Sequence, residues 1–174
     1  MGMTWKEIDE KYEPIADEHW KVCEIFGLKC PFDVFEQLFH DHHRDVDFAI
    51  PLVGVDWGRV IWREVSLSGV KLRQVAAPRG YQYAVDEART RTREEGIQDE
   101  RAEVVASWRD EGTWMRSPLL VEGDVIGSVL EYELLVGFTR LGNLLGLLDR
   151  GEIAEYATHR VWTGSIDRAL GRPY

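Results

Sequence analysis

The segment from Glu131 to Leu148 constrains the fold more than any other part of this chain, because its periodicity changes from that of a strand to that of a helix. Gly137 separates the two parts, and a glycine there lets the backbone turn sharply or approach a ligand closely. The first N–H groups of the following helix have no partner within the helix and can hold an anion. We therefore expect Gly137, Thr139 and Arg140 to form an anion-binding corner, where the Arg140 guanidinium suits a phosphate or carboxylate. The alternative is a structural turn in which Thr139 is an ordinary N-cap and Arg140 lies on the surface.

The rest of the chain contains both helical and strand-like patterns. We expect an α+β fold with a small mixed sheet and packed helices, which the family resemblance described below implies. We expect a helical N-terminal extension over residues 1–45 and an α+β domain over residues 46–174. After Pro31, an apolar stripe at helical spacing indicates core packing, and it consists of Phe32, Phe35, Leu38 and Phe39. The expected strands cover residues 46–55, 60–70, 117–121, 131–136 and 156–162, with a turn at 122–124. The expected helices cover residues 81–95, 100–111 and the stretch between Gly137 and Gly151.

The composition favours a soluble, acidic protein. A formal net charge of −10 argues against strong binding to nucleic acid or to an anionic membrane. The first residues lack the apolar core of a signal peptide, so we expect a cytoplasmic location. Cys23 and Cys30 are interpreted as reduced thiols, while a disulfide between them stays open as the alternative.

Two stretches together resemble the ParB/sulfiredoxin superfamily. The first runs from Ala106 to Val121, where a helix ends in glycine and leads to a strand that opens with proline. The second runs from Tyr132 to Leu141, where a strand enters a glycine–arginine box. The resemblance extends over roughly residues 60–162 and rests mainly on these two stretches. It implies a nucleotide-binding domain in which this box holds phosphate.

The resemblance implies further binding residues and a cofactor. Arg79 follows Pro78 at a position similar to the end of the family's first conserved box, so Arg79 would face the nucleotide from the opposite loop. A nucleoside triphosphate with Mg²⁺ is the implied ligand, and hydrolysis or phosphoryl transfer is the implied reaction. The box departs from the family where Phe138 replaces an acidic residue and Thr139 replaces an arginine. Sulfiredoxins carry a cysteine at the place of Phe138, and without that thiolate their reaction is not expected here.

A phosphoryl-transfer reaction would need a carboxylate that acts as a base or holds a metal ion. Glu64 and Glu133 are the candidates, together with Glu131, which shares a strand face with Glu133. The alternative for all three is an ordinary solvated carboxylate.

Histidines gather between residues 40 and 47. His40 and His43 are three residues apart near a helix end, so both side chains could reach one metal ion with Asp45 or Asp47. The alternative is that these histidines only complement the negative end of the helix dipole.

Two functions from different classes follow from these patterns. The first is a protein that binds a nucleotide or another phosphate ester, with or without catalysis. The second is a non-enzymatic protein-interaction module that retains the fold and has lost the chemistry, which Phe138 in the box favours.

Overall fold

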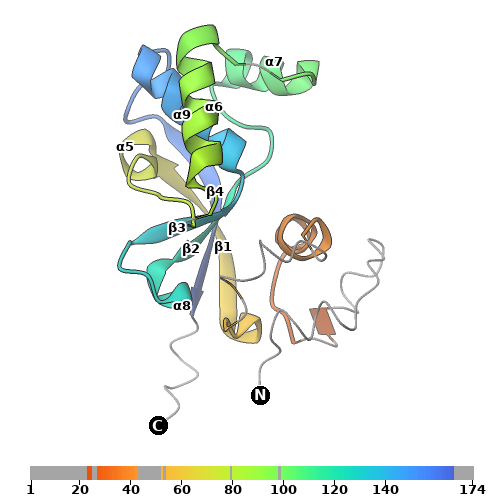
Figure 1. Cartoon of the computed structure of the whole chain (residues 1–174). Coiled ribbons are helices and arrows are strands. Elements are labelled where there is room, and N and C mark those ends of the chain that lie inside the picture. Colours follow the sequence, from red (N-terminus) through yellow and green to blue (C-terminus); the bar gives the residue numbers. More distant parts are fainter. Residues whose placement is uncertain are drawn as a thin grey trace. The chain divides into compact units, whose positions relative to one another are not determined.

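The computed structural model of this chain describes residues 23–24, 27–42, 52, 54–78, 80–97 and 99–166 (Figure 1). The chain divides into two compact units. One unit comprises Glu64–Leu120 and Tyr132–Trp162 and contains the predicted corner, so we call it the corner unit. The other comprises Met1–Arg63, Val121–Glu131 and Thr163–Tyr174.

Helices and strands alternate along the chain, which confirms the predicted α+β class. The helices are α3 (Phe32–Phe35), the π-helix η2 (Glu36–His40), the 3₁₀-helix η4 (Trp57–Arg59), α5 (Gly69–Leu72), α6 (Gln82–Glu95), α7 (Ala102–Glu111), α8 (Gly123–Ile126) and α9 (Phe138–Arg150). The strands are β1 (Val60–Ser68), β2 (Leu119–Glu122), β3 (Tyr132–Val136) and β4 (Thr158–Ile166).

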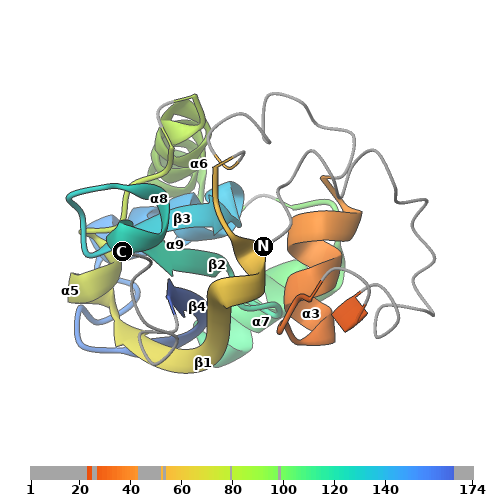
Figure 2. The same ribbon diagram turned by 90° about the horizontal axis from the view of Figure 1, so that it is seen from below.

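The four strands form one mixed sheet in the order β1-β4-β2-β3 (Figure 2). The last strand of the described residues, β4, therefore lies between β1 and β2. Beyond β3, Ala76 forms an isolated parallel bridge with Glu133, and the Leu134 N–H donates to the Ala76 carbonyl at 2.9 Å. This bridge satisfies part of the backbone at that edge of the sheet, and β3 has three consecutive buried residues at its end.

The core of the corner unit is built on α9. The predicted leucine stripe is confirmed, because all of its members are buried: Leu141, Leu144, Leu145 and Leu148. Burial of each leucine contributes roughly 1.5–3 kcal/mol to stability. Figure 1 shows α6 alongside α9, and their contact also includes a buried hydrogen bond of 2.9 Å from Thr92 Oγ1 to Asn143 Oδ1.

An ion-pair network joins the C-terminal end of α9 to α5 and α6. Asp149 accepts from Arg89 Nε at 2.7 Å and from Arg73 Nη1 at 2.8 Å, and Arg73 also pairs with Glu155. The hydrogen bonds from Arg89 and then Arg73 hold the pKa of Asp149 below its ordinary value. Asp149 is far from both Arg73 and Arg89 in the sequence, so these bonds tie distant segments together. A carboxylate can do this because it accepts hydrogen bonds from two arginines at once.

Aromatic residues form the core of the other unit. The predicted stripe after Pro31 is confirmed for Phe35, Leu38 and Phe39, which are buried, whereas Phe32 is 44% exposed. The Phe39 ring meets the Trp57 ring edge-on at 5.7 Å between centroids, and Trp57 stacks on Trp62 at 6.5 Å.

Three sequence predictions need correction at their boundaries. The strand expected up to Val70 ends at Ser68, because the Ser68 hydroxyl accepts from the Lys71 N–H and starts α5. The turn expected at 122–124 is the beginning of the short helix α8. The strand expected over 156–162 runs from 158 to 166 and lies between β1 and β2 in the sheet.

Other predictions fall largely on residues that the structure does not describe. Of the strand expected over 46–55, only Leu52, Gly54 and Val55 are described, and none of them lies in a strand. The remainder of that strand and residues 1–22 of the expected N-terminal extension lie outside the described residues.

Among the helices of the described part of the chain, none combines the length and apolar character of a membrane span.

Candidate functional site

The corner at Gly137 is formed as a sharp transition from β3 into α9. Gly137 is the N-cap of α9 and has φ 102° and ψ 34°, a left-handed conformation that side-chain-bearing residues rarely adopt. A Cβ on Gly137 would lie 2.7 Å from the Cβ of Pro118, so the close approach of two segments also requires glycine. No side chain caps the first turn of α9, which leaves the corner open to an external acceptor for its N–H groups.

Arg140 is held over this corner rather than extended into solvent. Its side chain is half-buried, and its Nη1 donates to the Arg116 carbonyl at 2.8 Å. Its Nε lies 3.0 Å from the position that a Cβ on Gly137 would occupy. The guanidinium charge is therefore fixed beside the start of α9, where the helix dipole is also positive.

The two residues between Gly137 and Arg140 differ in their surroundings. Thr139 is exposed, so a ligand from solution can reach its hydroxyl group. Phe138 is half-buried and stacks on Tyr81, with ring centroids 5.0 Å apart and an interplanar angle of 10°. The stack brings the loop before α6 to the corner, and nothing in the sequence identified Tyr81 as its partner.

Arg79 belongs to that same loop but lies outside the described residues. Its neighbours are described: the Tyr81 N–H donates to the Pro78 carbonyl at 2.7 Å, and Tyr81 contacts Phe138. The role expected for Arg79 stays a prediction.

The candidate carboxylates are not gathered at one point. Glu64 accepts from the Ser117 hydroxyl at 3.0 Å, and Arg160 Nη1 lies 3.9 Å from its other oxygen. Glu133 is half-buried on β3, and Glu131 precedes that strand and is exposed. Glu64 is the one with a structural link to the corner, because Ser117 follows Arg116, whose carbonyl holds Arg140.

The histidine cluster cannot be placed. The backbone of His40 ends η2, but its side chain lies outside the described residues, as do His43, Asp45 and Asp47. In the part of the chain that the structure describes, no three His, Cys, Asp or Glu side chains are grouped to hold a metal ion.

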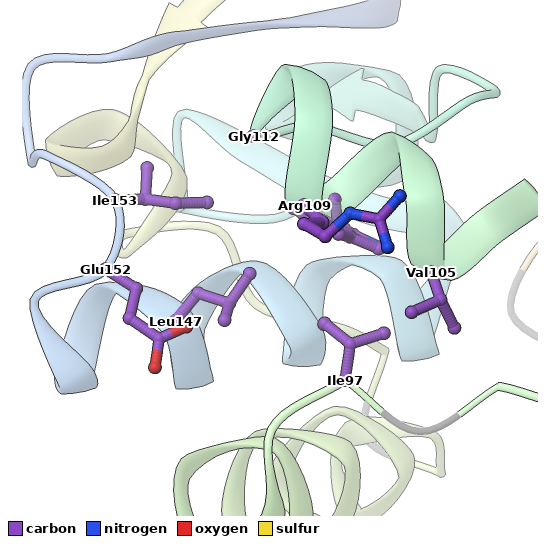
Figure 3. Close-up of a pocket in the computed structure, with 8 residues that line it drawn as sticks. Ile97, Val105, Arg109, Gly112, Leu147, Glu152 and Ile153 are labelled. Carbon is purple, nitrogen blue, oxygen red and sulfur yellow. The ribbon is translucent and has the colours of Figure 1, made fainter.

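A cavity of about 380 Å³ lies in the corner unit between α7 and α9. Figure 3 shows Val105 and Arg109 on α7 at one side and Leu147 on α9 at another. The sequence did not reveal this cavity, because its apolar residues follow the same helical periodicity as core residues. Its lining consists of Ile97, Val105, Trp108, Arg109, Gly112, Leu147, Glu152 and Ile153.

His159 is a buried residue of the corner unit that the sequence analysis missed. Its Nδ1 lies 3.1 Å from Thr113 Oγ1, whereas its Nε2 is buried and has no hydrogen-bond partner. The ring contacts Trp114, whose indole N–H donates to the Arg160 carbonyl at 2.7 Å. Burial lowers the pKa of His159, since the apolar surroundings disfavour the imidazolium.

We expect His159 to make the folded state sensitive to acid. The unfolded chain takes up a proton near the ordinary pKa of 6.5, while the folded chain resists it until a lower pH. The contribution of His159 to stability is therefore present above pH 6.5 and is lost as the pH decreases from there through the pKa of the folded state. Melting curves from about pH 7.5 to about pH 5 should show a smaller acid-induced decrease in His159→Asn than in the unchanged protein. Equal decreases in both proteins would contradict the expectation.

Comparison of this chain with family models, with curated proteins and with solved structures finds no match.

Proposed function

We propose that the corner at the start of α9 binds the phosphate of a nucleotide or of another phosphate ester, in a domain of ParB/sulfiredoxin type. The observation that carries the proposal is the Arg140 guanidinium, which is fixed over Gly137 beside a helix start that no side chain caps. Backbone N–H groups and a guanidinium are the two donor types that proteins combine at phosphate sites.

The held position of Arg140 supports phosphate binding on energetic grounds. An exposed arginine loses side-chain freedom when it binds a ligand, which costs up to about 2 kcal/mol. The Arg116 carbonyl already restricts Arg140, so less of that freedom is left to lose. The half-buried guanidinium is also less screened by solvent than an exposed one. Thr139, which is exposed in the same turn, is the expected hydroxyl contact.

We propose ligand binding as the activity of this corner. Catalysis would require a further functional group beside the bound phosphate. Hydrolysis or phosphoryl transfer needs a carboxylate that orients the nucleophile or holds Mg²⁺. Phe138 stands where the family has an acidic residue, and it stacks on Tyr81. Glu64 is the carboxylate on which such a reaction would depend, because its partner Ser117 adjoins the segment that holds Arg140.

Thermal stabilisation by ATP, CTP or GTP with Mg²⁺ tests the binding proposal. At a ligand concentration about 100 times the dissociation constant, binding adds roughly 2.7 kcal/mol to stability. For a chain of this length the melting temperature should rise by roughly 5–10 °C. We expect Arg140→Ala to abolish the rise, and Arg140→Lys to reduce it because lysine keeps the charge without the planar fork.

The matched control is Arg109→Ala, which removes an exposed arginine that pairs with the adjacent Asp110 on α7. This variant should keep the full stabilisation by nucleotide. The proposal fails if no nucleotide raises the melting temperature, or if Arg109→Ala and Arg140→Ala lose the rise equally.

The second candidate function is a non-enzymatic protein-interaction module. The cavity between α7 and α9 favours it, since a hollow of this size, lined by apolar side chains together with Arg109 and Glu152, accepts side chains of a partner segment. A defined partner that binds this chain and is lost in Val105→Glu, without any effect of nucleotides on stability, would favour this function over the first.

A further inference from the structure

Cys23 and Cys30 face each other across a short turn. Their sulfur atoms are 3.7 Å apart, within hydrogen-bond distance, and both thiols are free and half-buried. The turn is held by backbone bonds, in which the Leu28 N–H donates to the Cys23 carbonyl at 2.8 Å and the Gly27 N–H to the Glu24 carbonyl at 3.3 Å. A disulfide needs an S–S distance of roughly 2.0 Å, so the two sulfur atoms, now 3.7 Å apart, would have to move closer by less than the length of one more S–S bond.

We propose that Cys23 and Cys30 form a reversible dithiol–disulfide site that reacts with a small-molecule disulfide such as oxidised glutathione. The Cys23 thiolate attacks one glutathione sulfur, the S–S bond of glutathione breaks, and one glutathione thiolate leaves. Cys30 then loses its proton and attacks the Cys23 sulfur of the mixed disulfide, which releases the second glutathione. The protein is oxidised by two electrons, and one glutathione disulfide is reduced to two thiols.

The pKa shifts of the two cysteines distinguish the thiol that attacks glutathione from the thiol that resolves the mixed disulfide. The hydrogen bond from Cys30 lowers the pKa of Cys23, so Cys23 is the thiol that ionises first. The same hydrogen bond, followed by burial, raises the pKa of Cys30. Cys30 is therefore the resolving thiol, and it reacts only when Cys23 has become part of the mixed disulfide.

The turn between the cysteines lies against Gly58, which is next in the chain to an aromatic cluster that would sense the oxidation. The Gly27 carbonyl oxygen lies 3.2 Å from the position that a Cβ on Gly58 would occupy. Gly58 follows Trp57, whose ring packs between Phe39 and Trp62. Closing the disulfide stiffens the turn that carries Gly27, and we expect tryptophan fluorescence to change with oxidation and to return on reduction.

Incubation of the full chain with mixtures of oxidised and reduced glutathione, followed by acid quenching and mass spectrometry, tests the site. The unchanged protein should lose two hydrogens and carry no glutathione, and peptide mapping should locate the bond between Cys23 and Cys30. Cys30→Ser should accumulate a glutathione adduct on Cys23, because the resolving thiol is absent. Cys23→Ser should react with oxidised glutathione more slowly than Cys30→Ser, because burial still raises the pKa of the remaining Cys30 thiol.

The mass measurement on the unchanged protein needs no variant, so a folding defect in either serine variant does not affect it. The proposal is overturned if the unchanged protein retains a stable glutathione adduct or forms only disulfides between chains. It is also overturned if the unchanged protein stays reduced at a glutathione ratio that modifies Cys23 in Cys30→Ser.

Discussion

Replacing Gly142 with valine is expected to lower the free energy of unfolding by about 3 kcal/mol or more, since inserted methyl groups in a tight core force side chains and backbone apart. Gly142 lies on α9 against α6, where even a Cβ would approach the Val85 carbonyl oxygen to 2.5 Å and the Ala88 Cβ to 2.6 Å. Neither neighbour is the flexible end of a long side chain. The two helices must therefore separate, which disturbs the largest helix contact in the corner unit.

Gly142→Ala makes the test sharper because two physical effects predict opposite signs. Helix propensity alone predicts that alanine stabilises a helix interior by roughly 0.5–1 kcal/mol relative to glycine. The close contact with α6 predicts a net loss of about 2 kcal/mol, or a melting temperature lower by roughly 4–8 °C. Gly80→Ala is the control, since Gly80 is exposed and a Cβ there would have no neighbour within 4 Å. Stabilisation by Gly142→Ala would show that the helices are less closely packed than described.

Gly137→Ala is expected to cost about 3 kcal/mol of stability and to weaken the proposed phosphate binding at the same time. Left-handed backbone costs roughly 1–2 kcal/mol for alanine, and the clash with the Pro118 Cβ adds roughly 1–3 kcal/mol. The new methyl group would also meet the Arg140 guanidinium, whose Nε is 3.0 Å away, and would displace it from the corner. Chemical denaturation measures the first effect, and thermal stabilisation by nucleotide measures the second.

Gly151→Ala separates backbone strain from the clash at Gly137. Gly151 ends the same helix at φ 71°, and a Cβ there has nothing within 4 Å. This variant should lose only about 1 kcal/mol through strain and should keep its response to nucleotide. If both glycine variants lose equal stability, the contact with Pro118 contributes nothing and the account of the corner is wrong.

The elements with a clear period could be predicted from the sequence. The leucine spacing after Gly137 predicted both α9 and its buried face, and glycine at position 151 predicted where that helix ends. The sequence could not show which surface α9 offers to α6, because Gly142 and Gly146 look like helix-weakening residues until a partner helix is seen against them. It also could not give the strand order, since β4 pairs with strands far away in the chain.

The candidate site was predicted only as far as local geometry determines it. The left-handed Gly137 follows from a tight strand-to-helix transition, and a single glycine is a sufficient signal for it. The bond from Arg140 to the Arg116 carbonyl and the stack of Phe138 on Tyr81 join distant segments, so no local pattern contains them. His159 was missed for a related reason, because one histidine in a strand gives no sign of what surrounds it.

The position of β4 in the sheet has a consequence for how the chain folds during synthesis. Strand β2 can pair with β3 once both are made, whereas the neighbour of β1 in the sheet is β4, Thr158–Ile166, the last described strand. Until β4 inserts, β1 and one side of β2 carry unpaired backbone edges, and the closure of such long-range pairs slows folding. A nascent chain that stops before residue 158 therefore lacks the strand that joins its sheet, and it exposes edges that can pair with other chains.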